Sequence, residues 1–426
     1  MSKAPHLGIV LLSVIAILVS CTSKEESDRF MKEQLVHDAE VLKDSTRSII
    51  SRIDSTEITV NELEAKVNSL VVQAKVTGLA MSILNDNQII YRNAFGYANY
   101  DRKTPLLINH SFYGASLSKA VFGYLVSVLS NENVIDLDKP LQEYVDFPLY
   151  ELKSGDKWRG FQDLKNDKRL EKITARMCLS HTTGFQNWRW IPRPNDPEND
   201  RILKIYFEPG TQYYYSGEGM MLLQYVIEHI TGKELEALAS EKVFKPLQMK
   251  NTSYLWQERF EDKFCNGHTA EQGVLKKDKR DEAGAAGSME TNLIDYSLFV
   301  QHVMKLYKAN SGIAQNLFKP NFRIRTKAQF GPLSLQESNE NDNIQLNYGL
   351  GWGLLQTPYG FGTFKEGHGE GFQHFTIIFP EIGTGIVMLS NSDNAESIFK
   401  EILEISIGDT YTPWKWENYI PYQSKE

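Results

Sequence analysis

One helix-length segment with almost no polar face constrains the fold more than any other part of the chain. It reads GASLSKAVFGYLVSVL from Gly114 to Leu129, and a helix through it carries apolar side chains on nearly every side. A helix that is apolar all round is buried inside a large domain, whereas a surface helix keeps a polar face. We therefore expect this helix to lie at the centre of the fold.

Ser116 and Lys119 stand three residues apart at the start of this segment. Side chains at i and i+3 lie on one helix face, and a hydroxyl in the first turn lies in the positive field of the free N–H groups. Ser116 is therefore a candidate nucleophile, and the alternative is a simple helix N-cap. The same spacing occurs twice more, in a polar loop and on a late helix, at Ser154/Lys157 and Ser397/Lys400.

The composition favours a globular domain with a small-molecule or polymer partner. The chain has 426 residues, of which 41% are hydrophobic and 11% aromatic, enough for a sizeable core. Its net charge is −8 and it has no long basic run, so no nucleic-acid partner is expected. The nine histidines form neither H-E-x-x-H nor a cluster with cysteine, so we expect no metal site.

The N-terminus has the pattern of a targeting segment. Lys3 precedes the apolar run LGIVLLSVIAILV, which is short for a membrane span, and LVSC ends at Cys21. This pattern resembles a bacterial lipoprotein signal, which implies removal of residues 1–20 and lipid on the Cys21 sulfur. The mature protein would then be exported and membrane-anchored in the bacterial envelope. The alternative is a plain signal peptide or short anchor with an incidental cysteine.

The order of patterns predicts an α+β domain. Residues 21–57 are polar and are expected to form a stalk, and Thr59 and Glu62 begin the domain with a capping box. Strand patterns at 78–99 and after 348 flank a mostly helical middle, about 136–310. We expect one antiparallel sheet built from both ends of the chain, flanked by helices, with an inserted helical subdomain. The domain would span 58–406, and 407–426 would be a C-terminal tail.

Seven motifs in chain order carry a family resemblance. They are SLSK (116–119), LDKPL (137–141), LSHTTGF (179–185), PG with YYYSGEG (209–219), AAGSMET (285–291), YGLGW (348–352) and GHGEGF (367–372). In this order the motifs resemble those of the serine β-lactamase and penicillin-binding-protein-like hydrolases, in the class C, esterase and D-aminopeptidase-like branch. The resemblance covers about residues 60–405. It implies a β-lactamase/transpeptidase-like fold and a reaction without a cofactor.

The resemblance assigns Ser116 as nucleophile, Lys119 as its activating partner and Tyr215 as the relay of the proton to the leaving group. A free lysine, with a pKa near about 10.4, is a poor base at neutral pH. Burial and nearby charge would have to lower that pKa by about 3, which corresponds to about 4 kcal/mol. A buried helix start offers such a setting. Lys119 and Tyr215 are best treated as a coupled pair.

The third motif is expected on an edge strand that lines the cleft. His368 falls where the family carries Lys or His before a small residue, and the N–H groups near Gly371 and of Ser116 would form the oxyanion hole. Glu370 replaces the usual glycine, which leaves the register of this strand open by one residue.

The second motif departs from the family pattern as well. Family members commonly read Tyr-x-Asn, but this chain has Gly217 two residues after Tyr215 and loses the amide that contacts the acylamido side chain of β-lactams and peptides. This departure favours an ester or an unusual amide as the substrate. Two similar patterns, Ser392-Asp393-Asn394 and Tyr97-Ala98-Asn99, lie outside the family order and are interpreted as strand ends. His181 is interpreted as structural.

These observations lead to a membrane-anchored serine hydrolase with an acyl-Ser116 intermediate. Its substrate would be an ester, a D-amino-acid amide or a peptidoglycan-like peptide. The alternative is a catalytically weak binding or sensor lipoprotein, which the departures at Gly217 and Glu370 motivate. Cys178 and Cys265 are expected to be buried free thiols, with a disulfide as the alternative.

Overall fold

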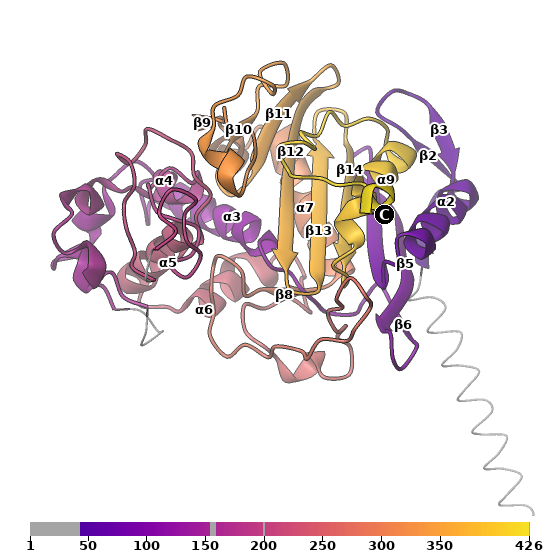
Figure 1. Ribbon diagram of the computed structural model, residues 1–426, viewed down its shortest axis with the longest axis horizontal. Helices are drawn as coiled ribbons and strands as arrows, with labels where there is room; N and C mark the ends of the chain where they lie inside the picture. Colours follow the sequence, from indigo (N-terminus) through magenta and orange to yellow (C-terminus); the bar gives the residue numbers. More distant parts are fainter. Residues whose placement is uncertain (1–42, 154–158, 199–200, 426) are drawn as a thin grey trace, which may run out of the picture.

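The computed structural model describes residues 43–153, 159–198 and 201–425 (Figure 1). Its strands are β1 (Lys43–Ser45), β2 (Ile49–Ser51), β3 (Glu57–Thr59), β4 (Gly78–Asn85), β5 (Gln88–Asn99), β6 (Thr104–Pro105), β7 (Phe112–Tyr113), β8 (Glu290–Thr291), β9 (Phe322–Arg323), β10 (Asn347–Tyr348), β11 (Gly353–Thr357), β12 (Gly360–Gly369), β13 (Phe372–Phe379) and β14 (Thr384–Ser390). Its helices are α2 (Val60–Gln73), α3 (Leu117–Asn131), α4 (Ala175–Leu179), α5 (Gly217–Thr231), α6 (Leu235–Ala239), α7 (Leu293–Lys308), α8 (Gly312–Phe318) and α9 (Phe399–Ser406).

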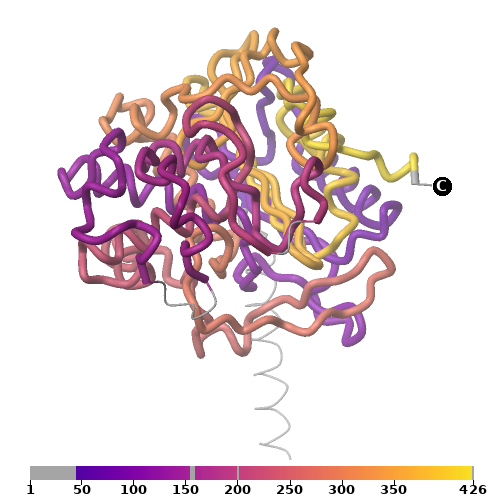
Figure 2. Tube along the Cα trace, turned by 60° about the vertical axis from the view of Figure 1, so that its left-hand side comes forward, coloured from indigo at the N-terminus to yellow at the C-terminus, as the bar shows by residue number. Residues whose placement is uncertain are grey.

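A ten-stranded antiparallel sheet joins the two ends of the chain, as the sequence predicts. Its order is β1-β5-β4-β14-β13-β12-β11-β10-β9, with β6 paired to β5. The junction is the pairing of β4 with β14, in which Leu79 lies opposite Ser390 and Leu84 opposite Gly385. Figure 2 shows these indigo and yellow segments side by side. Asp86 and Asn87, at φ 53° and 58°, form the tight turn between β4 and β5.

Both faces of the sheet are buried, because successive residues of each central strand contribute to two different cores. Ala80 and Leu84 of β4 pack on the side of α3 and α7, whereas Met81 and Ile83 pack on the side of α2 and α9. The predicted capping box begins α2, where Thr59 Oγ1 accepts from the Glu62 N–H. The alternation explains why these strands read as continuous apolar runs.

Helix α3 is buried along almost its whole length, which confirms the first expectation from the sequence. Two glycines allow the backbone around it to approach closely. A Cβ on Gly123 would clash with Leu350 O, and a Cβ on Gly351, which has φ 81°, would clash with Lys119 O. The loop before β11 therefore packs directly on the first turns of α3.

In the described part of the middle of the chain, regular secondary structure is almost entirely helical, with long irregular stretches between the helices. Among the described residues of 136–310, the only strand is β8, and α4, α5 and α6 lie beside α3, at the left and lower centre of Figure 1. These helices and the loops between them lie next to the start of α3.

Two boundaries differ from the sequence expectation. Strand β1 pairs with β5 and the β2–β3 hairpin buries Ile50 and Ile58, so the folded part includes residues that were expected in the stalk. The expected tail is also folded, because Ile407 and Trp416 are buried in the core. Isolated apolar residues in polar stretches do not produce a periodic pattern, and their burial depends on distant partners.

No helix within the described ranges is long and apolar enough to cross a membrane. The apolar run near the N-terminus and Cys21 lie outside the described residues.

Candidate active site

The start of α3 holds Ser116 and Lys119 together. Lys119 Nζ lies 2.9 Å from Ser116 Oγ and donates to Ala286 O at 2.6 Å. The Ser116 side chain makes no capping hydrogen bond, so the N-cap alternative does not account for it. Ala115, just before it, is buried with φ 45°, an uncommon conformation that turns the chain sharply into the helix.

Lys119 has the environment that a general base requires. Its side chain is 1% exposed. Burial lowers the pKa of Lys119 well below its ordinary value, the nearby Lys365 charge lowers it further, and Glu366 opposes the shift. A lysine in this setting gives up its proton far more readily than one in water.

Lys365 on β12 is a site residue that the sequence analysis missed. Its Nζ lies 3.2 Å from Tyr215 Oη and 2.7 Å from Glu366 Oε1, and its side chain is fully buried. Burial would lower the pKa of Lys365, but the Glu366 carboxylate and Tyr215 raise it above its ordinary value. Of the two buried lysines, the surroundings of Lys365 therefore favour the charged form and those of Lys119 favour the neutral form.

Tyr215 lies between the two lysines. Lys119 Nζ is 5.0 Å from the centre of its ring, and Lys365 Nζ is 5.1 Å from it. Burial raises the pKa of Tyr215 to about 12, although the Lys365 charge acts in the opposite direction. At neutral pH Tyr215 is therefore a neutral phenol that can donate a proton.

The His181 ring packs against the Tyr215 ring. Its ring centroid lies 4.1 Å from that of Tyr215, and its Nδ1 accepts from the Ser216 N–H at 3.1 Å. Burial, followed by the charges of Lys119 and Lys365, lowers the pKa of His181 well below its ordinary value. A neutral, fully buried histidine agrees with the structural role expected from the sequence.

His368 does not join the group around Ser116. Its Nε2 lies 3.2 Å from Glu396 Oε2, and its side chain is 37% exposed. Burial lowers the pKa of His368, but the hydrogen bond to Glu396 and the charges of Glu396 and Glu366 together raise it above its ordinary value. The basic side chain that β12 brings to Tyr215 is thus Lys365, three residues earlier in the chain.

The Gly371 N–H, expected as an oxyanion donor, is also bonded elsewhere. Its N–H donates to Asp393 Oδ1 at 2.8 Å, and Glu370 is exposed. Asp393 belongs to the Ser392-Asp393-Asn394 segment, which ends β14 as expected and uses its side chains to hold neighbouring loops. The Gly371 N–H is therefore committed to a structural bond.

The register of β12 indicates a different candidate for the backbone donor. Gly369 is paired with Phe372, so Glu370 and Gly371 form a two-residue turn, and the next pair is His368 with Gln373. In such a hairpin the closing pair exchanges hydrogen bonds and the next pair does not, so the His368 N–H points away from β13. On the other side of β12, the pairing with β11 ends at Phe364, so it does not extend to His368.

One face of β12 lies against the start of α3. A Cβ on Gly367 would lie 3.0 Å from Gly114 O and 3.2 Å from Leu117 Cγ, the residues on either side of the Ser116 turn. A Cβ on Gly369 would clash with the Tyr113 ring. The two glycines let the strand approach Ser116 closely.

Gly217 lies at the start of α5 against an indole ring. A Cβ on Gly217 would lie 2.6–2.8 Å from three ring atoms of Trp188. The space that an asparagine side chain would need at this position is therefore filled by Trp188, whose ring lies 6.0 Å from Lys119 Nζ.

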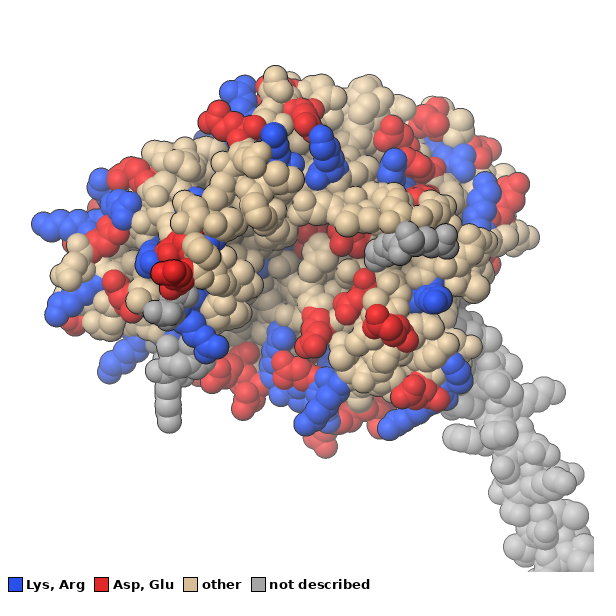
Figure 3. All heavy atoms as spheres, in the orientation of Figure 1, with Lys and Arg blue, Asp and Glu red and all other residues tan. Residues whose placement is uncertain are grey.

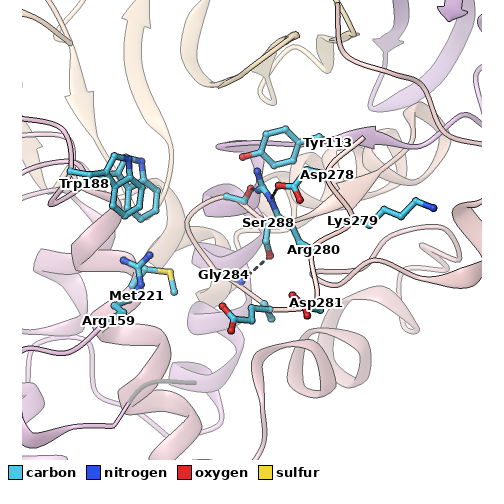
Figure 4. Close-up of a pocket in the computed structure, with 14 residues that line it drawn as sticks. Tyr113, Arg159, Trp188, Met221, Asp278, Lys279, Arg280, Asp281, Gly284 and Ser288 are labelled. Atoms are coloured by element: carbon cyan, nitrogen blue, oxygen red, sulfur yellow. Dashed lines mark hydrogen bonds and ion pairs between the residues drawn. The ribbon is translucent and has the colours of Figure 1, made fainter. Parts of the chain in front are cut away.

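A pocket of about 420 Å³ opens beside these residues (Figure 4). Trp188, Arg159 and Met221 lie on one side of it, and Tyr113, Arg280 and Ser288 lie on the other. The loop that carries Ser288 also supplies Ala286 O to Lys119. Figure 3 shows both signs of charge interspersed over the face it draws.

The other candidate residues are not assembled for catalysis. Ser397 Oγ donates to Asn394 O at 2.6 Å, and Lys400 pairs with Glu404. Ser154 and Lys157 lie outside the described residues. Cys178 and Cys265 are free and buried, as expected, and the described ranges contain no group of side chains suited to a metal ion.

Comparison with known proteins decides the family. The family model described as Beta-lactamase matches residues 63–405. The chain belongs to the beta-lactamase family. It is therefore a serine hydrolase with the fold that the sequence predicts.

Relatives with curated names agree with this assignment. The chain is 25% identical to penicillin-binding protein 4* of Bacillus subtilis (strain 168), over 76% of this chain and 71% of the relative. It is 27% identical to a putative D-alanyl-D-alanine carboxypeptidase of Escherichia coli O157:H7, over 76% and 80%. It is 23% identical to a D-aminopeptidase of Brucella anthropi, over 81% of this chain and 62% of the relative. Relatives named for peptidase activities favour a hydrolase over the alternative of a binding or sensor lipoprotein.

A solved structure supports the fold independently. The octameric penicillin-binding protein homologue from Pyrococcus abyssi superposes with a TM-score of 0.62 at 19% identity, over 84% of this chain and 79% of that one. The overall fold is thus shared with that homologue.

Proposed function

We propose that the protein hydrolyses an ester, a D-amino-acid amide or a peptidoglycan-like peptide through an acyl-Ser116 intermediate. The observation that carries the proposal is the contact of 2.9 Å between Ser116 Oγ and a fully buried Lys119 with a lowered pKa. Peptide bonds to D-amino acids enter as candidates because relatives are named D-aminopeptidase and D-alanyl-D-alanine carboxypeptidase.

The reaction proceeds in two balanced stages. Neutral Lys119 takes the proton of Ser116 as Oγ attacks the carbonyl carbon, and the negative charge passes to the carbonyl oxygen. The Ser116 and His368 N–H groups stabilise that oxyanion, and each such donor contributes about 3 to 4 kcal/mol to the transition state. The leaving group departs with a proton from Tyr215, which regains one from Lys119. Water then attacks the carbonyl carbon of the acyl-Ser116 ester while neutral Lys119 takes one of the water protons. The bond to Ser116 Oγ breaks, Oγ receives that proton from Lys119, and the carboxylic acid leaves.

Lys365 has an electrostatic role in this scheme. Its charge lowers the pKa of Lys119 and stabilises the Tyr215 oxygen when that oxygen carries negative charge. The buried Glu366 carboxylate, which also accepts from Gln329 at 3.0 Å, holds Lys365 in place.

We also propose export and lipid attachment at Cys21. The support is the apolar run followed by LVSC at residues 18–21.

A substrate panel tests the proposed function. The full-length protein in detergent would be offered p-nitrophenyl esters, nitrocefin and D-amino-acid p-nitroanilides, with Ser397→Ala as the matched control and Ser116→Ala as the test variant. We expect turnover of short-chain esters to exceed that of nitrocefin, because Gly217 offers no amide to an acylamido group. Rapid nitrocefin hydrolysis with little esterase activity, or turnover that persists in Ser116→Ala, would contradict the proposal.

A further inference from the structure

The pocket beside Ser116 has one flat aromatic wall. The rings of Trp188 and Trp190 are stacked, with centroids 4.9 Å apart and planes 10° from parallel. Both rings line the pocket. Trp190 is 42% exposed and Trp188 is half-buried, so this wall is open to solvent.

Buried charges hold this wall rigid. The Arg159 guanidinium lies 5.4 Å from the Trp188 ring and 5.7 Å from the Trp190 ring. Arg159 pairs with Glu218 at 3.2 Å, and Glu218 also accepts from Arg189 Nη2 at 2.9 Å and from the Arg189 N–H at 3.0 Å. Since Arg189 lies between the two tryptophans in the chain and Glu218 follows Gly217, this network fixes the indoles relative to the start of α5.

The wall occupies the place of the missing amide. Trp188 contacts Gly217 so closely that a side chain at 217 and the indole cannot share the space. The chain has therefore exchanged a polar contact next to the reacting serine for an apolar, planar one.

We propose that Trp188 and Trp190 form a specificity subsite that binds an aromatic or similarly planar apolar group on the acyl side of the scissile bond. The inference rests on the proposed acyl-Ser116 chemistry. Planar groups suit this wall because aromatic rings stack favourably and a rigid ring loses little conformational freedom when it binds.

The charges of the pocket do not select a charged substrate. Its lining has three basic residues (Arg159, Lys279, Arg280) and three acidic ones (Asp278, Asp281, Glu282). Arg280 is already engaged, since it donates to Gly287 O and Asp278, each at 2.8 Å, and lies 4.0 Å from the Tyr113 ring. Selection must therefore come from shape and stacking.

Two p-nitrophenyl esters with the same leaving group test the subsite. We would measure kcat/KM of the full-length protein for p-nitrophenyl phenylacetate and p-nitrophenyl acetate, and use the ratio of the two values as the readout. The wild-type protein should prefer the phenylacetyl ester. Trp188→Ala and Trp190→Ala should each reduce the ratio by about tenfold, the size of effect that one apolar contact in a specificity pocket gives. Trp188→Phe, which keeps an aromatic ring, should retain most of the wild-type ratio.

The controls separate this inference from the proposed function. Ile191→Ala, next to the wall and 46% exposed but outside the pocket lining, should leave the ratio unchanged. If Trp188→Ala does not fold, Trp190→Ala, at an exposed position, provides the test instead. An unchanged ratio in a folded Trp variant, with turnover still dependent on Ser116, overturns the subsite alone. Turnover that survives Ser116→Ala overturns the acyl-Ser116 proposal instead.

Discussion

At the scale of single residues, the two buried lysines of the site have different roles. Lys119 has no carboxylate in contact and is beside Ser116, whereas Lys365 is paired with Glu366. The positive charge of Lys365 therefore persists, and it helps to keep Lys119 neutral. The same residue is 3.2 Å from Tyr215, so it links the base to the proton relay.

Replacing Lys365 tests this division. Lys365→Met should reduce acylation by about 100-fold or more, as the loss of one preorganised charge in a buried site does. Removing a positive charge raises the pKa of Lys119, and the unpaired Glu366 raises it further. The acidic limb of the acylation-rate profile should therefore move to higher pH. Single-turnover labelling rates across pH measure both effects.

His368→Gln is the matched control for Lys365→Met. It alters a side chain that faces Glu396 and keeps the backbone N–H, so labelling should fall by less than about tenfold. A larger loss in His368→Gln than in Lys365→Met would show that the strand register inferred from the geometry is wrong.

The site residues differ in how visible they are in the sequence. Ser116 and Lys119 are recognisable because their spacing coincides with an apolar helix start. Lys365 is hidden, because it stands two residues before Gly367 whereas His368 stands directly before Gly369, and only the three-dimensional contact with Tyr215 shows which basic residue joins the site. Trp188 and Gly217 are 29 positions apart in the chain (217 − 188 = 29), so no local pattern predicts their contact.

At the scale of elements, the segment after α9 matters more than a tail would. Trp416 is 1% exposed, donates to Thr326 Oγ1 at 3.0 Å, and lies among Tyr213 and Phe364. Tyr213 is two residues before Tyr215, and Phe364 precedes Lys365. The C-terminal segment thus packs against residues that lie next to Tyr215 and Lys365 in the chain.

Truncating this side chain should destabilise the fold. Trp416→Ala should lower the free energy of unfolding by about 3 to 5 kcal/mol, as for other buried aromatic residues. Ile420→Ala, in the same segment but 56% exposed, should change it little. Denaturant unfolding followed by circular dichroism compares them, and equal stabilities would mean that residues 407–425 do not contribute to the core.

The main elements follow from local patterns, whereas their boundaries do not. α2, α3 and the β4–β5 hairpin have strong periodicity or a capping box, and the structure confirms them. β1, with three residues, has no pattern of its own and exists through its pairing with β5. The Trp416 segment likewise depends on partners far away in the chain.

At the scale of the whole molecule, we expect a folded hydrolase linked through its N-terminal region to a membrane. The wild-type protein should fractionate with membranes and begin at lipid-modified Cys21. Cys21→Ala should release the protein from membranes or leave its signal uncleaved. Membrane fractionation with intact-mass analysis measures this, and a mature protein with unmodified Cys21 would end the lipoprotein proposal.

The most direct test of the account is the location of a covalent adduct. A fluorophosphonate probe should modify the wild-type protein once, and mass spectrometry of the digested protein should place the adduct on Ser116. Ser116→Ala should remove the adduct with little change in stability, because the Ser116 side chain makes no capping bond, whereas Ser154→Ala and Ser397→Ala should label normally. An adduct on another serine, or labelling that survives Ser116→Ala, would contradict the central claim that Ser116 is the nucleophile.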